Sequence, residues 1–251
     1  MVTENAEREL ETALERAATE PAHRPEFFQK LLAANAYILG SSQELAEGEH
    51  TLETDSRISI AHWEKQDGSR FFPFFSSLEQ LQKAIQYEQS YIRIPVRALF
   101  EITKGSNLVM NPGSSYGKEF LPNEIEALLS SRVNQVADRR VVEKETRVLL
   151  GQPEKYPSEM TASLSILFSK HANVQAAYLA LMQTGGSDEK PVLVIGIEGD
   201  GDLEEVLRQA GTVAADSPKD ADFVDLTVVT ESDTGLSRYF KESTTPFYRK
   251  S

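Results

Sequence analysis

The segment from Asn111 to Lys118, NPGSSYGK, gathers residue types that can bind a small anion or face a partner. Its glycines and serines can present backbone N–H groups and hydroxyls, and Lys118 adds a positive charge. The spacing is not that of a phosphate-binding loop, because the GxxxxGK[ST] pattern is missing. The same letters suit a tight hairpin turn, since Pro-Gly and Tyr-Gly pairs supply the required backbone angles. Two interpretations stay open: a simple chain reversal, or a binding surface made by Asn111, Pro112, Gly113, Ser114, Ser115, Tyr116, Gly117 and Lys118.

A second candidate is an aromatic run upstream of this loop, which contains Phe71, Phe72, Phe74 and Phe75. Strand alternation sends neighbouring phenylalanines to opposite faces of a sheet. Pro73 interrupts the run and predicts an edge strand, because proline has no N–H to donate to a neighbouring strand. An aromatic edge is either covered by a helix or used as a contact surface. The run is therefore interpreted as core, with a partner surface as the alternative.

Metal and cofactor chemistry finds no support in the sequence. The acidic group from Glu198 to Glu205 departs from a calcium loop, because Leu203 stands where the loop needs glycine. We interpret it as the start of a helix capped by Asp202, where the helix dipole favours carboxylates. The four histidines have no metal-ligand spacing, and the chain has no cysteine. We therefore expect no metal site, no cofactor and no catalytic residues.

The charge balance limits the classes of partner. The chain carries 39 acidic against 26 basic residues, a net charge of -13. Such a surface repels phosphate backbones and anionic lipids, so we expect neither nucleic acid nor a membrane as partner. Residues 1–20 are charged throughout and lack the apolar run of a signal peptide. Together with the absence of cysteine, this predicts a cytoplasmic protein.

The elements that must position these residues are those of an α/β (α+β) protein with two domains of mixed sheets flanked by helices. In the first half, Ile58 to Glu64 and Arg70 to Phe75 predict a hairpin around an Asp-Gly turn. Ser77 and Gln80 form a capping-box pattern that opens a helix. Strands are expected on both sides of the NPGSSYG turn, and Pro122 is expected to open the helix that follows.

The second half has the order strand, helix, strand, strand, helix, strand, which predicts a ferredoxin-like βαββαβ domain. The terminal residues 244–251, TTPFYRKS, are expected to fray, to dock on the chain or to reach a partner. Between the halves, residues 131–144 are highly charged and weakly periodic, so we place the boundary there. The expected divisions are an N-terminal helix over 1–20, an N-terminal domain over 21–135 and a C-terminal domain over 145–251.

Five segments together resemble the enhanced serine sensitivity, or SseB-like, family. They are LVMNPGSSYGKEFLPNEIEALL (108–129), RFFPFFSSLEQLQ (70–82), VLVIGIEGD (192–200), DFVDLTVV (222–229) and TPFYRK (245–250). The resemblance covers nearly the whole chain from about residue 20. It implies a bacterial cytoplasmic protein with an SseB-like N-terminal and C-terminal domain and a link to serine sensitivity. It implies no reaction and no catalytic residues.

We therefore expect a non-catalytic protein-interaction or regulatory module whose partner is another protein, with a homodimer as a further option. The alternative is a sensor that binds an amino acid or an anion, and an uncharacterised enzyme comes third. The loop around Ser114 and Ser115 separates the first two functions. Polar groups that converge in a closed pocket favour the sensor, whereas a protruding loop favours the partner.

Overall fold

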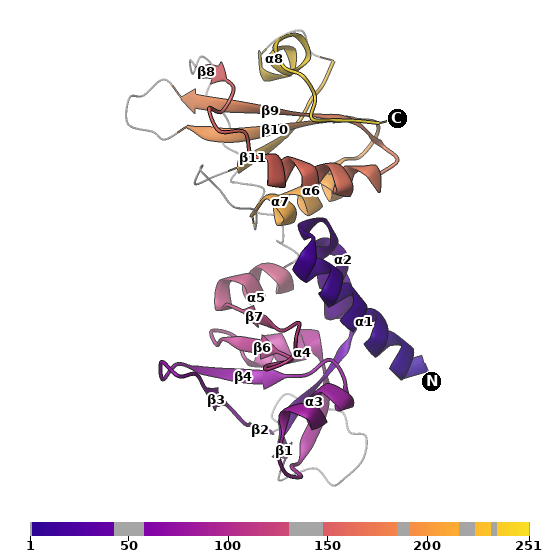
Figure 1. Cartoon of the computed structure of the whole chain (residues 1–251), viewed down its shortest axis with the longest axis vertical. Helices are drawn as coiled ribbons and strands as arrows, with labels where there is room; N and C mark the ends of the chain where they lie inside the picture. The colour runs from indigo at the N-terminus through magenta and orange to yellow at the C-terminus, as the bar shows by residue number, and fades with distance from the viewer. Residues whose placement is uncertain are drawn as a thin grey trace. The chain divides into compact units, whose positions relative to one another are not determined.

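The structure is a computed structural model that describes residues 2–42, 58–130, 148–184, 191–215, 224–231 and 235–250. The chain divides into two compact units, and each is described by itself: Met1–Ala18 with Glu26–Arg132, and Thr19–Pro25 with Val133–Ser251. Both units combine helices with β-sheets (Figure 1), which confirms the α/β class and the organisation into two parts. The expected boundary segment 131–144 lies outside the described residues, as do residues 185–188, whose sequence GGSD predicts a turn, and His50, one of the four histidines.

Two helices begin the N-terminal unit: α1 (Val2–Thr19) and α2 (Arg24–Ala33). The buried face of α1 consists of Leu10, Ala13, Leu14 and Ala17, which recur at helical spacing. Glu7 on the same helix accepts a hydrogen bond from the Tyr37 hydroxyl at 2.9 Å. The first helix is therefore packed into this unit.

Two sheets make up the rest of the N-terminal unit. The first has the order β2-β1-β5, formed by β1 (Asn35–Ser42), β2 (Ile58–Ile60) and β5 (Tyr91–Pro95). The second has the order β3-β4-β6-β7, formed by β3 (Trp63–Glu64), β4 (Arg70–Phe74), β6 (Leu108–Met110) and β7 (Lys118–Phe120). The predicted strand Ile58 to Glu64 is thus divided, because its first part pairs with β1 and only its end pairs with β4.

The prediction that Pro73 marks an edge strand is wrong, because β4 lies between β3 and β6. Phe72 donates its N–H to Asn107 on the β6 side. Since successive N–H groups of a strand point in opposite directions, the backbone nitrogen of Pro73 points toward the β3 side. There β3 pairs only with Arg70 and Phe71. The missing N–H of Pro73 therefore falls where no ladder bond is required.

Three short helices complete this unit: α3 (Leu78–Ala84), α4 (Val96–Ile102) and α5 (Pro122–Leu129). Ser77 caps α3 by accepting the N–H of Gln80, as the sequence predicts. Pro122 opens α5, also as predicted. The core between helices and sheet is rich in aromatic contacts, and the rings of Phe74, Phe100 and Phe120 lie within 6.0 Å of one another.

The C-terminal unit is built on one sheet with the strand order β11-β10-β9-β12, and β8 also pairs with β9. Its strands are β8 (Val148–Gly151), β9 (Val174–Thr184), β10 (Val192–Gly199), β11 (Val224–Val228) and β12 (Tyr248–Arg249). The order of elements is the predicted one, but the pairing does not confirm the ferredoxin-like detail. In a split βαβ unit another strand separates the two parallel strands, whereas β10 and β11 are direct parallel neighbours.

Strand β9 is long enough to pair with two short strands along the same edge. Its C-terminal part, from Leu181 to Thr184, pairs with β8, and its N-terminal part, at Ala176 and Ala177, pairs with β12. One edge of a long strand thus accommodates two short ones. The terminal TPFYRK segment therefore docks on the chain, which is one of the outcomes that the sequence left open.

Helices cover both faces of this sheet (Figure 1). One face carries α6 (Ser158–Ser169) and α7 (Glu204–Ala215), and the other carries α8 (Gly235–Ser243). A short 3-10 helix, η1 (Pro21–His23), also belongs to this unit. The sheet is therefore buried on both sides, which accounts for the continuous apolar run in β10.

Candidate functional site

The predicted loop is the turn between β6 and β7, which pair antiparallel with Met110 opposite Lys118. We call residues 111–117 the β6–β7 turn. Its backbone closes on itself, because Ser114 donates its N–H to the Asn111 carbonyl at 3.2 Å. Gly117 is required by a close approach, since a Cβ there would lie 3.0 Å from the Asn111 carbonyl oxygen. The segment is a hairpin turn of defined shape.

Asn111 is buried and anchors the turn. It is 3% exposed and has a positive φ of 48°, a conformation that asparagine tolerates better than most residues. Its side-chain Oδ1 accepts the backbone N–H of Ser76 at 2.9 Å, and its Nδ2 donates to the Ser76 hydroxyl at 2.9 Å. This residue therefore serves the fold and is not part of an open binding surface.

A carboxylate from α1 completes this polar cluster. The Glu11 carboxylate accepts hydrogen bonds from the hydroxyls of Ser76 and Ser77, at 2.7 and 2.8 Å. Both serines are buried. Sequence reasoning found Ser77 as a helix cap but missed Glu11 and Ser76, because no local pattern joins residues more than sixty positions apart.

The tip of the turn points away from the unit. Gly113, Ser115, Tyr116 and Gly117 are exposed, and Tyr116 keeps 39% of its surface accessible. Ser114 is half-buried, and its hydroxyl donates to the Tyr116 carbonyl at 2.9 Å. The polar groups of the turn are thus directed largely to their own chain, while Ser115 and Tyr116 face outward.

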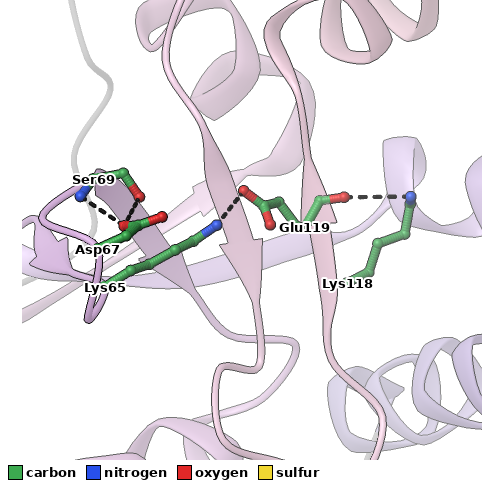
Figure 2. Close-up of polar contacts among 5 residues, drawn as sticks. All are labelled: Lys65, Asp67, Ser69, Lys118 and Glu119. Atoms are coloured by element: carbon green, nitrogen blue, oxygen red, sulfur yellow. Dashed lines mark hydrogen bonds and ion pairs between the residues drawn. The ribbon is translucent and has the colours of Figure 1, made fainter.

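Lys118 is engaged by its own chain. Its Nζ lies 2.8 Å from Glu124 Oε1 and 4.8 Å from the centre of the Phe120 ring. The same Nζ approaches the Glu119 carbonyl oxygen at 3.4 Å, as Figure 2 shows. An anion bound at this lysine would have to compete with Glu124, and the ring below restricts the direction of approach.

Glu119, next along β7, forms an ion pair with Lys65 of the β3–β4 hairpin at 2.6 Å (Figure 2). The hairpin turn itself is closed by Asp67, whose Oδ1 accepts from the hydroxyl and the N–H of Ser69 at 2.6 and 2.9 Å. These two hydrogen bonds hold the pKa of Asp67 below its ordinary value. Lys65 and Glu119 are therefore paired with each other, and Asp67 is bonded within its own turn.

The aromatic run is core. Phe74 and Phe75 are fully buried, Phe71 is 8% exposed, and Phe72 is half-buried. Trp63 packs on Phe71 and Phe75 with ring centres 6.2 Å away. The run therefore offers little free surface, and the β6–β7 turn is the candidate that reaches solvent.

The acidic group near α7 behaves as a helix start. Asp202 Oδ1 accepts the N–H of Glu204, the first residue of α7, at 2.8 Å. Nearby, Asp200 accepts from the Gln175 side chain at 2.5 Å. Among the residues that the structure describes, no group of three His, Asp or Glu side chains could hold a metal ion. Within the same ranges, no helix has the length and apolar character needed to cross a bilayer.

Comparison with known proteins gives matches over almost the whole chain. The sequence models described as the SseB protein N-terminal domain and C-terminal domain match residues 10–127 and 142–250. Protein SseB of Escherichia coli (strain K12) is 39% identical over 242 residues, which cover 96% of this chain and 92% of that protein. The chain belongs to the SseB family. Protein SseB of Shigella flexneri matches with the same identity and coverage. No solved structure matches the chain.

The β6–β7 turn lies within the SseB N-terminal domain, and a cluster of titratable groups lies in the SseB C-terminal domain. There Tyr178 of β9 donates its hydroxyl to Glu198 of β10 at 2.7 Å, and Lys241 of α8 lies 3.2 Å from the same carboxylate. Burial and the hydrogen bond to Glu198 raise the pKa of Tyr178 to about 12. A phenol with this pKa stays protonated near neutral pH. Its hydroxyl therefore acts as a hydrogen-bond donor between β9 and β10 and cannot act as a base.

The pKa of Glu198 is set by opposing causes. Burial tends to raise it, but the hydrogen bonds from Tyr178 and Lys241, with the charges of Lys241 and Arg249, together lower it. The carboxylate therefore stays ionised and joins β10 to α8. Sequence reasoning missed this cluster, because its members come from four separate elements.

Proposed function

We propose that this protein is a non-catalytic protein-interaction module of the SseB family, acting in the cytoplasm, that presents the β6–β7 turn to a protein partner. The observation that carries the proposal is the outward tip of the turn. Its anchor Asn111 is buried and hydrogen-bonded, while Ser115 and Tyr116 remain exposed. The link to serine sensitivity that the family resemblance implies would act through this partner.

A rigid exposed tip suits recognition of a folded partner. Binding loses less entropy when the loop already has its bound shape. Asn111, Gly117 and the Ser114 hydrogen bonds maintain that shape without help from a ligand. Tyrosine is enriched at binding hot spots, because its ring supplies contact area and its hydroxyl a hydrogen bond. The turn therefore combines a fixed backbone with a favourable contact residue.

The same geometry argues against an anion or amino acid as the main ligand of this turn. Lys118 is paired with Glu124, and the Ser114 hydroxyl donates to a backbone carbonyl. The protein as a whole is strongly acidic, with a net charge of -13, which disfavours anions over its surface. The loop lacks the converging free donors that a sensor would need.

The test is recovery of a partner by the tagged protein from its own cell lysate, followed by titration of the purified pair. Tyr116→Ala should weaken binding by roughly 30-fold, the effect of removing a hot-spot tyrosine. Tyr87→Ala is the matched control, because Tyr87 is 72% exposed but lies outside the turn. Equal binding by the two variants, or recovery of no protein by the native form, would refute the proposal.

The sensor function has a separate readout. If serine or another amino acid raises the melting temperature of the native protein, and Lys118→Met abolishes that rise, the turn binds a small molecule and the sensor function replaces ours. Binding of a ligand only to the folded state stabilises it in proportion to the logarithm of ligand concentration. We expect no such rise.

A further inference from the structure

The connector between α1 and α2 belongs structurally to the C-terminal unit. Residues Thr19–Pro25 cluster with 133–251, whereas the helices on either side cluster with the N-terminal unit. The family matches divide the chain differently, because the SseB N-terminal domain spans 10–127 and the C-terminal domain spans 142–250. The connector thus lies inside the sequence range of one domain and packs in the other.

A single alanine anchors the connector in an apolar cluster. Ala22 of η1 is 2% exposed and belongs to the core cluster beneath α6 and α7. The α6 members of that cluster are Met160, Leu164, Leu167 and Phe168. Because η1 packs against α6, removal of the connector would uncover apolar surface at this helix.

A lysine at the end of α6 holds the connector by polar contacts. Lys170 Nζ donates to the Ala22 carbonyl at 3.2 Å and lies 3.1 Å from His23 Nδ1. The connector is already shaped for this contact, since the Glu20 carboxylate accepts the Ala22 N–H at 3.2 Å. The Glu20 carbonyl also accepts the His23 N–H at 3.1 Å. A pre-shaped turn pays less entropy when it docks.

We propose that residues 19–25 form a clasp: the C-terminal unit carries, at α6 and Lys170, a binding site for this segment of the same chain. The clasp contributes one small buried side chain, that of Ala22, and a few hydrogen bonds. The rest of the C-terminal unit buries many larger apolar side chains. Segments with so few buried contacts open at low free energy while the core stays closed. The clasp therefore opens locally, without unfolding of the C-terminal unit.

The test uses single cysteines in the full chain, which has none of its own. Ala22→Cys reports the clasp, Ala210→Cys reports the core beneath α7, and Ala162→Cys is an exposed reference on α6. Each is made with Lys170 and with Lys170→Ala, and the rate of thiol labelling is measured under native conditions. Hydrogen exchange of the peptide covering 19–25 in the cysteine-free protein gives a second measure.

We expect Cys labelling at position 22 to be about 100-fold slower than at 162 but faster than at 210, as local opening requires. Lys170→Ala should accelerate labelling at 22 roughly tenfold, because a hydrogen bond from a charged donor is lost, and leave 210 unchanged. Hydrogen exchange over 19–25 should accelerate in parallel. Labelling at 22 as fast as at 162, with rapid exchange over 19–25, would show that the segment is not docked. Equal acceleration at 22 and 210 would show that no separate clasp exists.

Discussion

At the scale of a single residue, Asn111 has a positive φ and makes two buried hydrogen bonds with Ser76. Substitutions at this position can separate the cost of the positive φ from the loss of the hydrogen bonds. The positive φ costs an ordinary side chain about 1 kcal/mol, and glycine avoids this cost. The hydrogen bonds to Ser76 are lost in any residue without the amide. The turn that carries the proposed interface therefore depends on both properties.

Asn111→Ala should lower the free energy of unfolding of the N-terminal unit by about 2–4 kcal/mol, since strain and an unsatisfied buried N–H at Ser76 add. Asn111→Gly should lower the free energy of unfolding by about 1 kcal/mol less than Asn111→Ala does, because glycine loses the hydrogen bonds but adopts the positive φ without strain. Urea unfolding of both variants measures the difference. An alanine variant as stable as the glycine variant would contradict the role of φ.

Gly196 on β10 is a second residue with a steric role. A Cβ at this position would lie 2.6 Å from Phe240 of α8 and 2.7 Å from a methyl group of Val229. Gly196→Ala should therefore displace α8 and cost about 1–3 kcal/mol of stability, as overpacking does. Gly151→Ala on β8 is the control, because no heavy atom lies within 4 Å of its Cβ. Thermal melts that are identical for both variants would refute this prediction.

At the scale of elements, α8 and β12 are joined to the sheet by the cluster around Glu198. Lys241 comes from α8, Tyr178 from β9, and Arg249 from β12. Docking of the terminal segment is reinforced by Phe247, which donates its N–H to the Ala177 carbonyl at 2.9 Å. The C-terminal segment is therefore held on the sheet by side-chain charge as well as by backbone pairing.

Because the pKa of Glu198 is lower in the folded protein than its ordinary value of 4.5, its contribution to stability is present above about pH 4.5. That contribution is lost as the pH falls through the folded-state pKa. Glu198→Gln should therefore destabilise the native protein near pH 7, and the difference from the native protein should shrink toward about pH 3. Urea unfolding over this range measures it, with Lys241→Met and the double variant to isolate the pair. A difference independent of pH would contradict the ionised role of Glu198.

At the scale of the whole molecule, each of the two units contains hydrophobic clusters of its own. The described C-terminal clusters contain Ala22 and residues from Met160 onward, while the cluster around Tyr37 and Phe75 belongs to the N-terminal unit. Destabilisation in one core should therefore spread within its own unit first.

Hydrogen exchange should show this separation directly. Gly196→Ala should accelerate exchange in β9, β10 and α8, while β4 and β6 keep the native rates. Asn111→Ala should accelerate exchange in β4 and β6, while β9, β10 and α8 keep the native rates. In each variant the unaffected unit serves as the internal control. Equal acceleration in both units would show that they unfold as one cooperative body.

The sequence by itself determined features that depend on neighbouring residues. The Ser77 cap, the helix opened by Pro122 and the hairpin around NPGSSYG all follow from local backbone chemistry, and the structure confirms them. The family resemblance was also visible in the sequence, because it rests on the letters themselves.

Only the tertiary structure decided which strands became neighbours and which side chains were buried. Pro73 predicted an edge strand, but β4 pairs with β3 on one side and with β6 on the other. Asn111 meets Ser76 from 35 residues away, and Lys170 meets Ala22 from 148 residues away. No local pattern encodes such contacts, because they arise from the burial of whole faces against each other. The sequence favoured a core role for the aromatic run, and the tertiary structure confirmed it, while the tip of the β6–β7 turn stayed exposed.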